Sequence, residues 1–197
     1  MAKINNIEFN NFRNFTHLKT SFDNKLNILF GNNGSGKTNI LEGISLIAKG
    51  RGLRNTNFIN LIKSKKEYFK IYNNVEIKDN NFDVTIYPKK NNERYKKIIE
   101  VNNDMSKESI EFLYKSISIL TFLPEMERLF QSSPSYRRNF IDRLIFSSSK
   151  GYNKLINKYK KLLIERFKIL QASNFDNSWL DQIEKEISSS GFEIYNA

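Results

Sequence analysis

The chain has 197 residues, enough for one good hydrophobic core or for one domain with part of a second. It contains no cysteine, which excludes disulfides and cysteine-based zinc sites, and no apolar run of about 18 residues, so we expect no membrane partner. The net charge of +11 favours a polyanionic partner, although lysine is abundant throughout the chain and the positions of the charges say more than their number. The N-terminus lacks a signal-peptide core, which predicts a cytoplasmic protein.

The first 50 residues predict strands followed by one helix. Residues 3–30 are interpreted as strands, the last of them a short buried strand at 26–30. Residues 37–48 carry apolar side chains at helical spacing and predict a helix that ends before Gly50 and Gly52.

The middle of the chain predicts strands joined by tight turns. Strands are expected at 68–77, 82–87 and 95–101, with asparagine pairs such as Asn80-Asn81 between or after them. A short helix is expected at 106–114, followed by a buried strand at 117–122.

The last third predicts helices. Ser133 as N-cap and Pro134 at the first helical position begin one helix. A longer helix is expected at about 150–170, and a last one begins at Asn177 or Ser178. The chain ends at Ala197 soon afterwards, which we interpret as a truncation. Residues 1–147 are expected to form one domain and 148–197 the start of another.

One motif carries specific chemistry. The segment "GNNGSGKT" matches the phosphate-binding pattern G-x-x-x-x-G-K-[ST] in full, between a predicted strand and a predicted helix. Its glycines let successive backbone N–H groups surround an anion, and the helix dipole adds to their attraction. Lysine at this position reaches the β- and γ-phosphates, and the threonine hydroxyl binds Mg²⁺. The predicted ATP and Mg²⁺ site therefore comprises Gly31, Asn32, Asn33, Gly34, Ser35, Gly36, Lys37 and Thr38, with Thr38 as the metal ligand.

A series of segments in fixed order resembles the RecF family of DNA replication and repair ATPases. They are "FNNFRNF" at 9–15, the P-loop with its continuation "NILEGI", "GRGLRN" at 50–55, "FLPEMERLFQSSPSYRRNFID" at 122–142 and "WLDQIEKEISSSGFEI" at 179–194. The resemblance implies an α/β fold. This would be the N-terminal part of an ABC/SMC-type ATPase head, with a mixed sheet and helices, followed by the first helices of an α-helical arm.

The same resemblance implies a function and partners. It implies ATP-dependent binding of DNA, at gaps or single-strand/duplex junctions, in recombinational repair and the SOS response. It also implies RecR/RecO-type mediators and an ATP-dependent homodimer. Family members take a Walker B acid and a signature loop from a C-terminal half, and neither motif is recognised here. The "ISSSG" segment at 187–191 falls in the predicted arm helix. No catalytic residue is therefore assigned, and hydrolysis by this chain alone is not expected.

Other charged residues are weaker candidates. The resemblance places Arg13 near nucleotide phosphates or DNA, whereas the simpler interpretation is an exposed loop arginine. Arg51 and Arg54 could contact DNA phosphates or lie in a solvated loop. On the helix at 150–170, a lysine arc opposite the apolar side could follow duplex phosphates or be an ordinary solvated face; the arc includes Lys154, Lys158 and Lys161.

Four further residues have no assigned role. Glu125 could approach the metal, and Arg137 and Arg138 could pair with acids inside the head. His17 is interpreted as a surface or packing residue. Two alternatives remain open for the whole chain: a remnant without catalytic activity, and a generic P-loop enzyme such as a small-molecule kinase.

Overall fold

The computed structural model describes residues 2–23, 25–92, 94–122, 133–148, 151–172 and 176–196. They divide into two compact units, Met1–Ile119 and Leu120–Ala197. The expected fold class is confirmed, because a sheet with packed helices is followed by a helical region. The boundary between the units precedes the predicted domain boundary at 147, because the helix α3 (Pro134–Ser148) belongs to the second unit. The predicted domain boundary itself stays a prediction.

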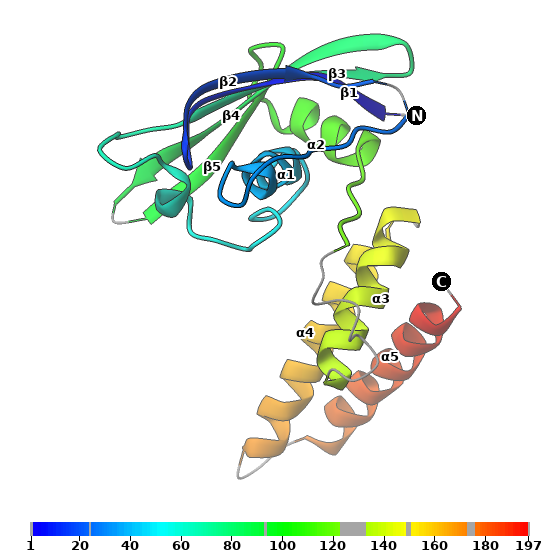
Figure 1. Cartoon of the computed structure of the whole chain (residues 1–197). Coiled ribbons are helices and arrows are strands. Elements are labelled where there is room, and N and C mark those ends of the chain that lie inside the picture. Colours follow the sequence, from blue (N-terminus) through cyan, green and yellow to red (C-terminus); the bar gives the residue numbers. More distant parts are fainter. Residues whose placement is uncertain are drawn as a thin grey trace. The chain divides into compact units, whose positions relative to one another are not determined.

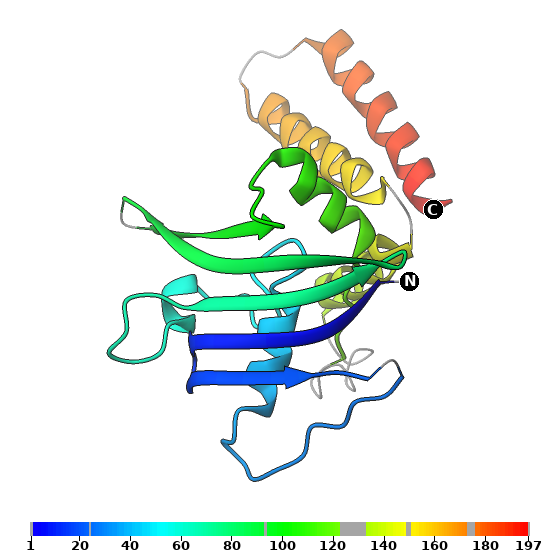
Figure 2. The ribbon, with the colours of Figure 1, turned by 90° about the horizontal axis from the view of Figure 1, so that it is seen from above.

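The first unit is built on a five-stranded antiparallel sheet with the order β2-β1-β3-β4-β5 (Figure 2). Its strands are β1 (Ala2–Phe12), β2 (Phe15–Ser21), β3 (Lys70–Ile77), β4 (Asn80–Asn91) and β5 (Arg94–Val101). The three strands predicted between 68 and 101 are thus confirmed. Lys78 and Asp79, both at positive φ, form the turn between β3 and β4, so the pair Asn80-Asn81 begins a strand instead of forming the predicted turn.

Two helices, α1 (Lys37–Ser45) and α2 (Lys107–Ser116), lie on the same face of this sheet (Figure 1). Alternate strand residues face them and are fully buried, among them Ile7 and Phe9 of β1 and Ile71 and Val75 of β3. The opposite face of the sheet is covered by no helix within the described part of this unit (Figure 2).

Two predicted strands are wrong. Residues 26–30 are extended but pair with no strand among the described residues, and Leu26, Ile28 and Phe30 are 75, 73 and 90% exposed. An apolar segment becomes a buried strand only where a neighbouring strand supplies backbone hydrogen bonds. Residues 26–30 do not add a strand to the sheet, because β2 is its edge strand. Residues 117–122 likewise form no strand, because the Ile117 N–H caps α2 by donating to Leu113 O.

The described residues of the second unit form three helices: α3 (Pro134–Ser148), α4 (Tyr152–Gln171) and α5 (Asn177–Tyr195). They confirm the three predicted helices, including the start at Pro134. Asp176 caps α5 by accepting from the Ser178 N–H. Helices α4 and α5 lie side by side (Figure 1) and bury Tyr152, Leu162, Ile169 and Ile183. None of the described helices is long and apolar enough to cross a membrane.

Candidate nucleotide-binding site

The glycine-rich loop turns sharply before α1. Gly31, Gly34 and Gly36 have φ values of 144, 82 and 103°, a region that side chains with a Cβ rarely adopt. Gly36 is the N-cap of α1 and no side chain caps the helix there. The N-terminal N–H groups of α1 therefore face the loop without a side-chain acceptor, which is the arrangement that binds phosphate in P-loop proteins.

Lys37 crosses the loop that precedes it. Its Nζ donates to Gly31 O at 2.8 Å and to Asn32 O at 2.9 Å. Thr38, the next residue, is exposed. The ammonium group thus lies on the loop itself, where it can exchange a carbonyl oxygen for a phosphate oxygen without a large movement of the side chain.

The turn between β1 and β2 holds the loop against the sheet. Asn14 Nδ2 donates to Ser35 O at 3.4 Å, and Asn39 Nδ2 donates to Asn14 Oδ1 at 2.8 Å. A Cβ at Gly36 would lie 2.4 Å from Phe15 Cζ, so only glycine fits between the loop and this ring. These contacts give a physical reason for the joint presence of the "FRNF" and "GSGKT" segments.

Glu42 on α1 is the residue that sequence reasoning missed. Its side chain is 1% exposed, and both carboxylate oxygens accept from Arg13: Nε donates to Oε2 and an Nη atom donates to Oε1, each at 2.8 Å. Arg54 Nη1 lies 3.4 Å from Glu42 Oε2, and Thr56 Oγ1 lies 3.4 Å from Oε1. A buried carboxylate at one helical turn after Lys37 therefore joins α1 to two loops. A glutamate on the buried side of an amphipathic helix was the available signal.

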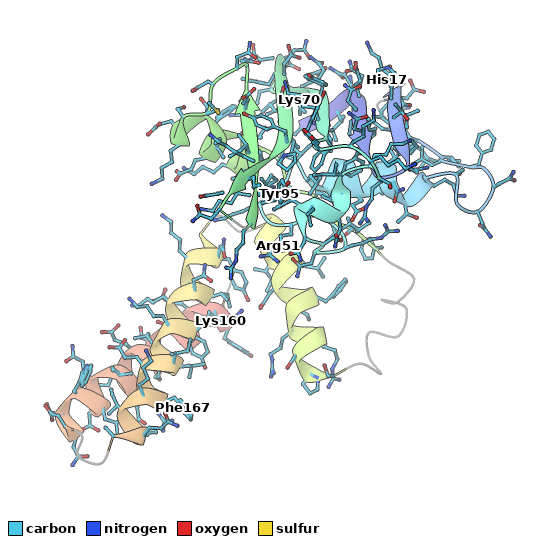
Figure 3. The ribbon with its side chains drawn as sticks, turned by 90° about the vertical axis from the view of Figure 1, so that its left-hand side faces the viewer. His17, Arg51, Lys70, Tyr95, Lys160 and Phe167 are labelled. Atoms are coloured by element: carbon cyan, nitrogen blue, oxygen red, sulfur yellow. The ribbon has the colours of Figure 1, made fainter. Side chains whose placement is uncertain are left out.

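These contacts bear on three predicted phosphate ligands. Arg13 also donates to Asn60 O at 3.0 Å, so its guanidinium is engaged within the protein. Arg54 faces Asn39 Oδ1 at 3.3 Å besides Glu42. Arg51 is exposed and has no hydrogen-bond or ion-pair partner in the part of the chain that the structure describes (Figure 3). Contact of these arginines with nucleotide or DNA stays a prediction.

The predicted lysine arc lies on α4. Lys154, Lys158 and Lys161 are exposed there, and Lys158 Nζ pairs with Glu186 of α5 at 3.5 Å. The "ISSSG" segment lies inside α5, as predicted. On α3, Arg137 and Arg138 are exposed, and Arg138 contacts Ser135 of its own helix at 3.4 Å. His17 is exposed, and its Nδ1 lies 2.9 Å from Asn10 Oδ1. Glu125 lies outside the described residues.

Lys97 of β5 holds the other end of α1. Its Nζ donates to Leu46 O at 2.8 Å and to Ala48 O at 2.7 Å, and it lies 5.7 Å from the centre of the Tyr114 ring. Burial lowers the pKa of Lys97 to about 8. The two carbonyl acceptors favour the ammonium form and oppose that decrease. Together, Asn14 near the first turn and Lys97 at the end fix α1 on the sheet.

The described residues offer little to a metal besides Thr38. No group of three His, Cys, Asp or Glu side chains among them could hold an ion. In nucleotide sites Mg²⁺ commonly takes most of its ligands from phosphate oxygens and water.

A known family model matches most of the first unit. Residues 3–121 match the family described as "RecF/RecN/SMC N terminal domain". Among curated proteins, the DNA replication and repair protein RecF of Rickettsia typhi is 37% identical over 186 residues, covering 94% of this chain and 51% of that protein. RecF of Rickettsia prowazekii is 36% identical over 193 residues, covering 98% and 52%.

Solved structures agree with these relatives. A structure of the recombination mediator protein RecF-ATPrS in the RecFOR pathway matches with a TM-score of 0.78 and 27% identity, over 98% of this chain and 52% of the other. RecF-ATP matches with a TM-score of 0.76 and 27% identity, over 99% and 52%. The chain thus spans about half the length of the relatives that it matches.

Proposed function

The chain belongs to the RecF/RecN/SMC N-terminal domain family, and from this membership we propose that it binds ATP with Mg²⁺ at the loop 31–38 and acts on DNA in replication and recombinational repair. The observation that carries the proposal is the complete P-loop with Lys37 lying across it. The likeness to solved structures named RecF-ATPrS and RecF-ATP supports ATP as the nucleotide.

In this proposal each loop residue has one task. Backbone N–H groups of residues 31–38 surround the phosphates, and Lys37 Nζ moves from Gly31 O and Asn32 O onto the β- and γ-phosphate oxygens. The Thr38 hydroxyl is one ligand of Mg²⁺, which when bound neutralises phosphate charge. The pair of Arg13 and Glu42 keeps the α1 helix and the β1–β2 turn in one position, and contact of Arg13 with the nucleotide is proposed from the family resemblance.

The partners are proposed from family membership. They are gapped DNA or a single-strand/duplex junction, RecR/RecO-type mediators, and a second copy in an ATP-dependent homodimer. A cytoplasmic location and a role in the SOS response follow from the same membership. Arg51, Arg54, Lys154, Lys158 and Lys161 are the proposed DNA contacts, and their exposure on the loop after α1 and on α4 supports this.

The nucleotide site is tested by titration of a fluorescent ATP analogue in the presence of Mg²⁺. We expect Lys37→Ala to weaken binding by at least about tenfold, because a hydrogen bond to a charged group is worth about 1.5–3 kcal/mol. Lys25→Ala is the matched control, since Lys25 is exposed and has no hydrogen-bond or ion-pair partner among the described residues. Circular dichroism checks that both variants fold. Equal affinity of wild type and Lys37→Ala would refute the site.

A further inference from the structure

A hollow of about 460 Å³ opens beside the loop that precedes β3. It is lined by Asn10, Tyr68, Phe69, Lys70, Tyr72, Tyr87 and Pro88. Lys70, Tyr72 and Tyr87 alternate with buried residues along β3 and β4, so they lie on the sheet face that carries no helix in the described unit (Lys70 is labelled in Figure 3). Lys70 Nζ lies 5.3 Å from the centre of the Tyr72 ring and 5.7 Å from that of Tyr87, so the ammonium group is held between two aromatic rings.

A second hollow, of about 690 Å³, adjoins the first at Pro88, which lines both. Its other lining residues are Ile59, Ile62, Lys63, Ser64, Lys65, Lys66, Glu67, Lys90 and Tyr95. Five lysines and one carboxylate therefore line the two hollows. The excess of positive charge exceeds what the abundance of lysine in the chain explains, and it makes this surface complementary to a polyanion.

The loop 61–69 that separates the hollows is firmly attached to the sheet. The Arg13 N–H donates to Leu61 O, and the Lys63 N–H donates to Asn11 O, each at 2.8 Å. At the other end, the fully buried Phe69 packs edge-on against Phe12, with ring centres 5.2 Å apart. The residue before Phe69, Tyr68, consequently points outward and is 57% exposed.

The lysines of this surface differ in whether they bind other residues of the protein. Lys63 Nζ donates to Asn14 O at 2.8 Å and to Thr16 Oγ1 at 2.7 Å, so it has a structural task. Lys65, Lys66 and Lys90 are exposed and have no ion-pair partner among the described residues. Three cations are thus available around an outward tyrosine on a fixed loop.

We propose that this surface, composed of loop 63–68 with Lys70, Tyr72, Pro88 and Lys90, binds single-stranded DNA. Lys65, Lys66 and Lys90 contact phosphates, and Tyr68 provides the ring on which a base stacks. Lysines that follow a backbone, interleaved with exposed aromatic rings, are the combination that binds single strands without sequence preference. A duplex cannot use the ring, because its bases are already stacked, and an acidic peptide has no base to place there. The surface is separate from the proposed contacts at Arg51 and Arg54, which line neither hollow, and only the class of partner rests on the proposed function.

The test measures binding of fluorescein-labelled oligo(dT) by anisotropy over a range of salt concentrations, with the full chain. The triple variant Lys65→Gln, Lys66→Gln, Lys90→Gln removes three of the proposed phosphate contacts. Its matched control carries the same charge change at Lys25, Lys78 and Lys107, which are exposed on the first unit and line neither hollow. Tyr68→Ala removes the ring on which a base would stack, whereas Tyr68→Phe keeps the ring and removes only the hydroxyl.

We expect the first triple variant to flatten the plot of log affinity against log salt by about 2, since each single-strand phosphate contact contributes about 0.7. The control triple variant keeps the wild-type slope. Tyr68→Ala binds about tenfold more weakly, whereas Tyr68→Phe binds as wild type. Duplex DNA and poly-glutamate respond to the lysine substitutions but not to Tyr68→Ala.

Two results would overturn the proposal. One is an equal loss of slope in both triple variants, which would mean that net charge alone attracts DNA. The other is oligo(dT) binding that falls only when Lys154, Lys158 and Lys161 are changed to Gln; this would leave the proposed function intact and place the single strand on α4. ATP binding, measured in parallel, stays at the wild-type level in all of these variants.

Discussion

The two compact units hold their helices in different ways. In the first, α1 is tied to the sheet by a buried carboxylate, a close helix–strand approach and a lysine at its C-terminal end. In the second, α4 and α5 pair through a narrow buried strip, and their arginine–glutamate pair, Arg166 with Glu184 at 2.7 Å, has both partners more than 40% exposed. The difference teaches that the glycine-rich loop 31–38 precedes a helix held by buried and specific contacts, whereas α4 and α5 are held mainly by apolar packing.

The comparison is strongest for the ion pairs. We expect Glu42→Ala to destabilise the first unit by about 3 kcal/mol, because it leaves the largely buried Arg13 guanidinium without its partner. Glu184→Ala, which breaks an exposed pair in the second unit, is expected to cost less than about 1 kcal/mol. The stability of the first unit is measured by hydrogen exchange of the backbone amides of β1 and β3. Fluorescence of Trp179, the only tryptophan, reports the second during urea unfolding. Similar costs in the two units would remove the distinction.

Glycine-to-alanine substitutions give effects of opposite sign. A Cβ on Gly43 of α1 would lie 2.1 Å from Phe9 Cε1, so Gly43→Ala forces the helix from the sheet and should cost about 2 kcal/mol. A Cβ on Gly191 of α5 meets only Tyr159 Cε2 at 3.5 Å, an ordinary contact. Gly191→Ala should therefore stabilise the second unit by about 0.5–1 kcal/mol through helix propensity. Hydrogen exchange of the first unit and Trp179 fluorescence of the second again measure these changes. Stabilisation by Gly43→Ala would show that α1 does not pack closely against β1.

In the first unit, Lys97 gives a pH dependence of stability. The ordinary pKa of a lysine, which applies to the unfolded chain, is 10.5, and burial in the folded protein lowers that of Lys97 to about 8. Between these values the unfolded chain binds more protons, so the free energy of unfolding rises with pH, by at most about 3 kcal/mol across the window. Below pH 8 both states are protonated and this contribution is constant.

Lys97→Met should abolish this rise while removing the donor of Leu46 O and Ala48 O. Lys96→Met, at the exposed neighbouring position, is the control. Because burial also raises the pKa of Tyr114, whose ionisation opposes folding at higher pH, the slopes are compared below pH 10. A rise that persists in Lys97→Met would assign the pH dependence to another group.

Local sequence determined much of this protein. The strands between 68 and 101, the helix starts at Ser106 and Pro134, and the P-loop were predictable, because side-chain alternation, caps and glycines act within a few residues. The loop predicted from "GNNGSGKT" has its glycines at positive φ, as a tight turn requires, and the phosphate contacts of Lys37 stay a prediction.

Tertiary structure decided the rest. Residues 26–30 have the pattern of a buried strand, yet a strand exists only where a neighbouring strand accepts its hydrogen bonds, and the pattern contains no information about that neighbour. The engagement of Arg13 and Arg54 with Glu42 joins residues 29 and 12 positions apart in sequence. The basic surface around Tyr68 forms because Phe69 is drawn into the core against Phe12, a contact between distant segments that buries one aromatic ring and turns its neighbour outward.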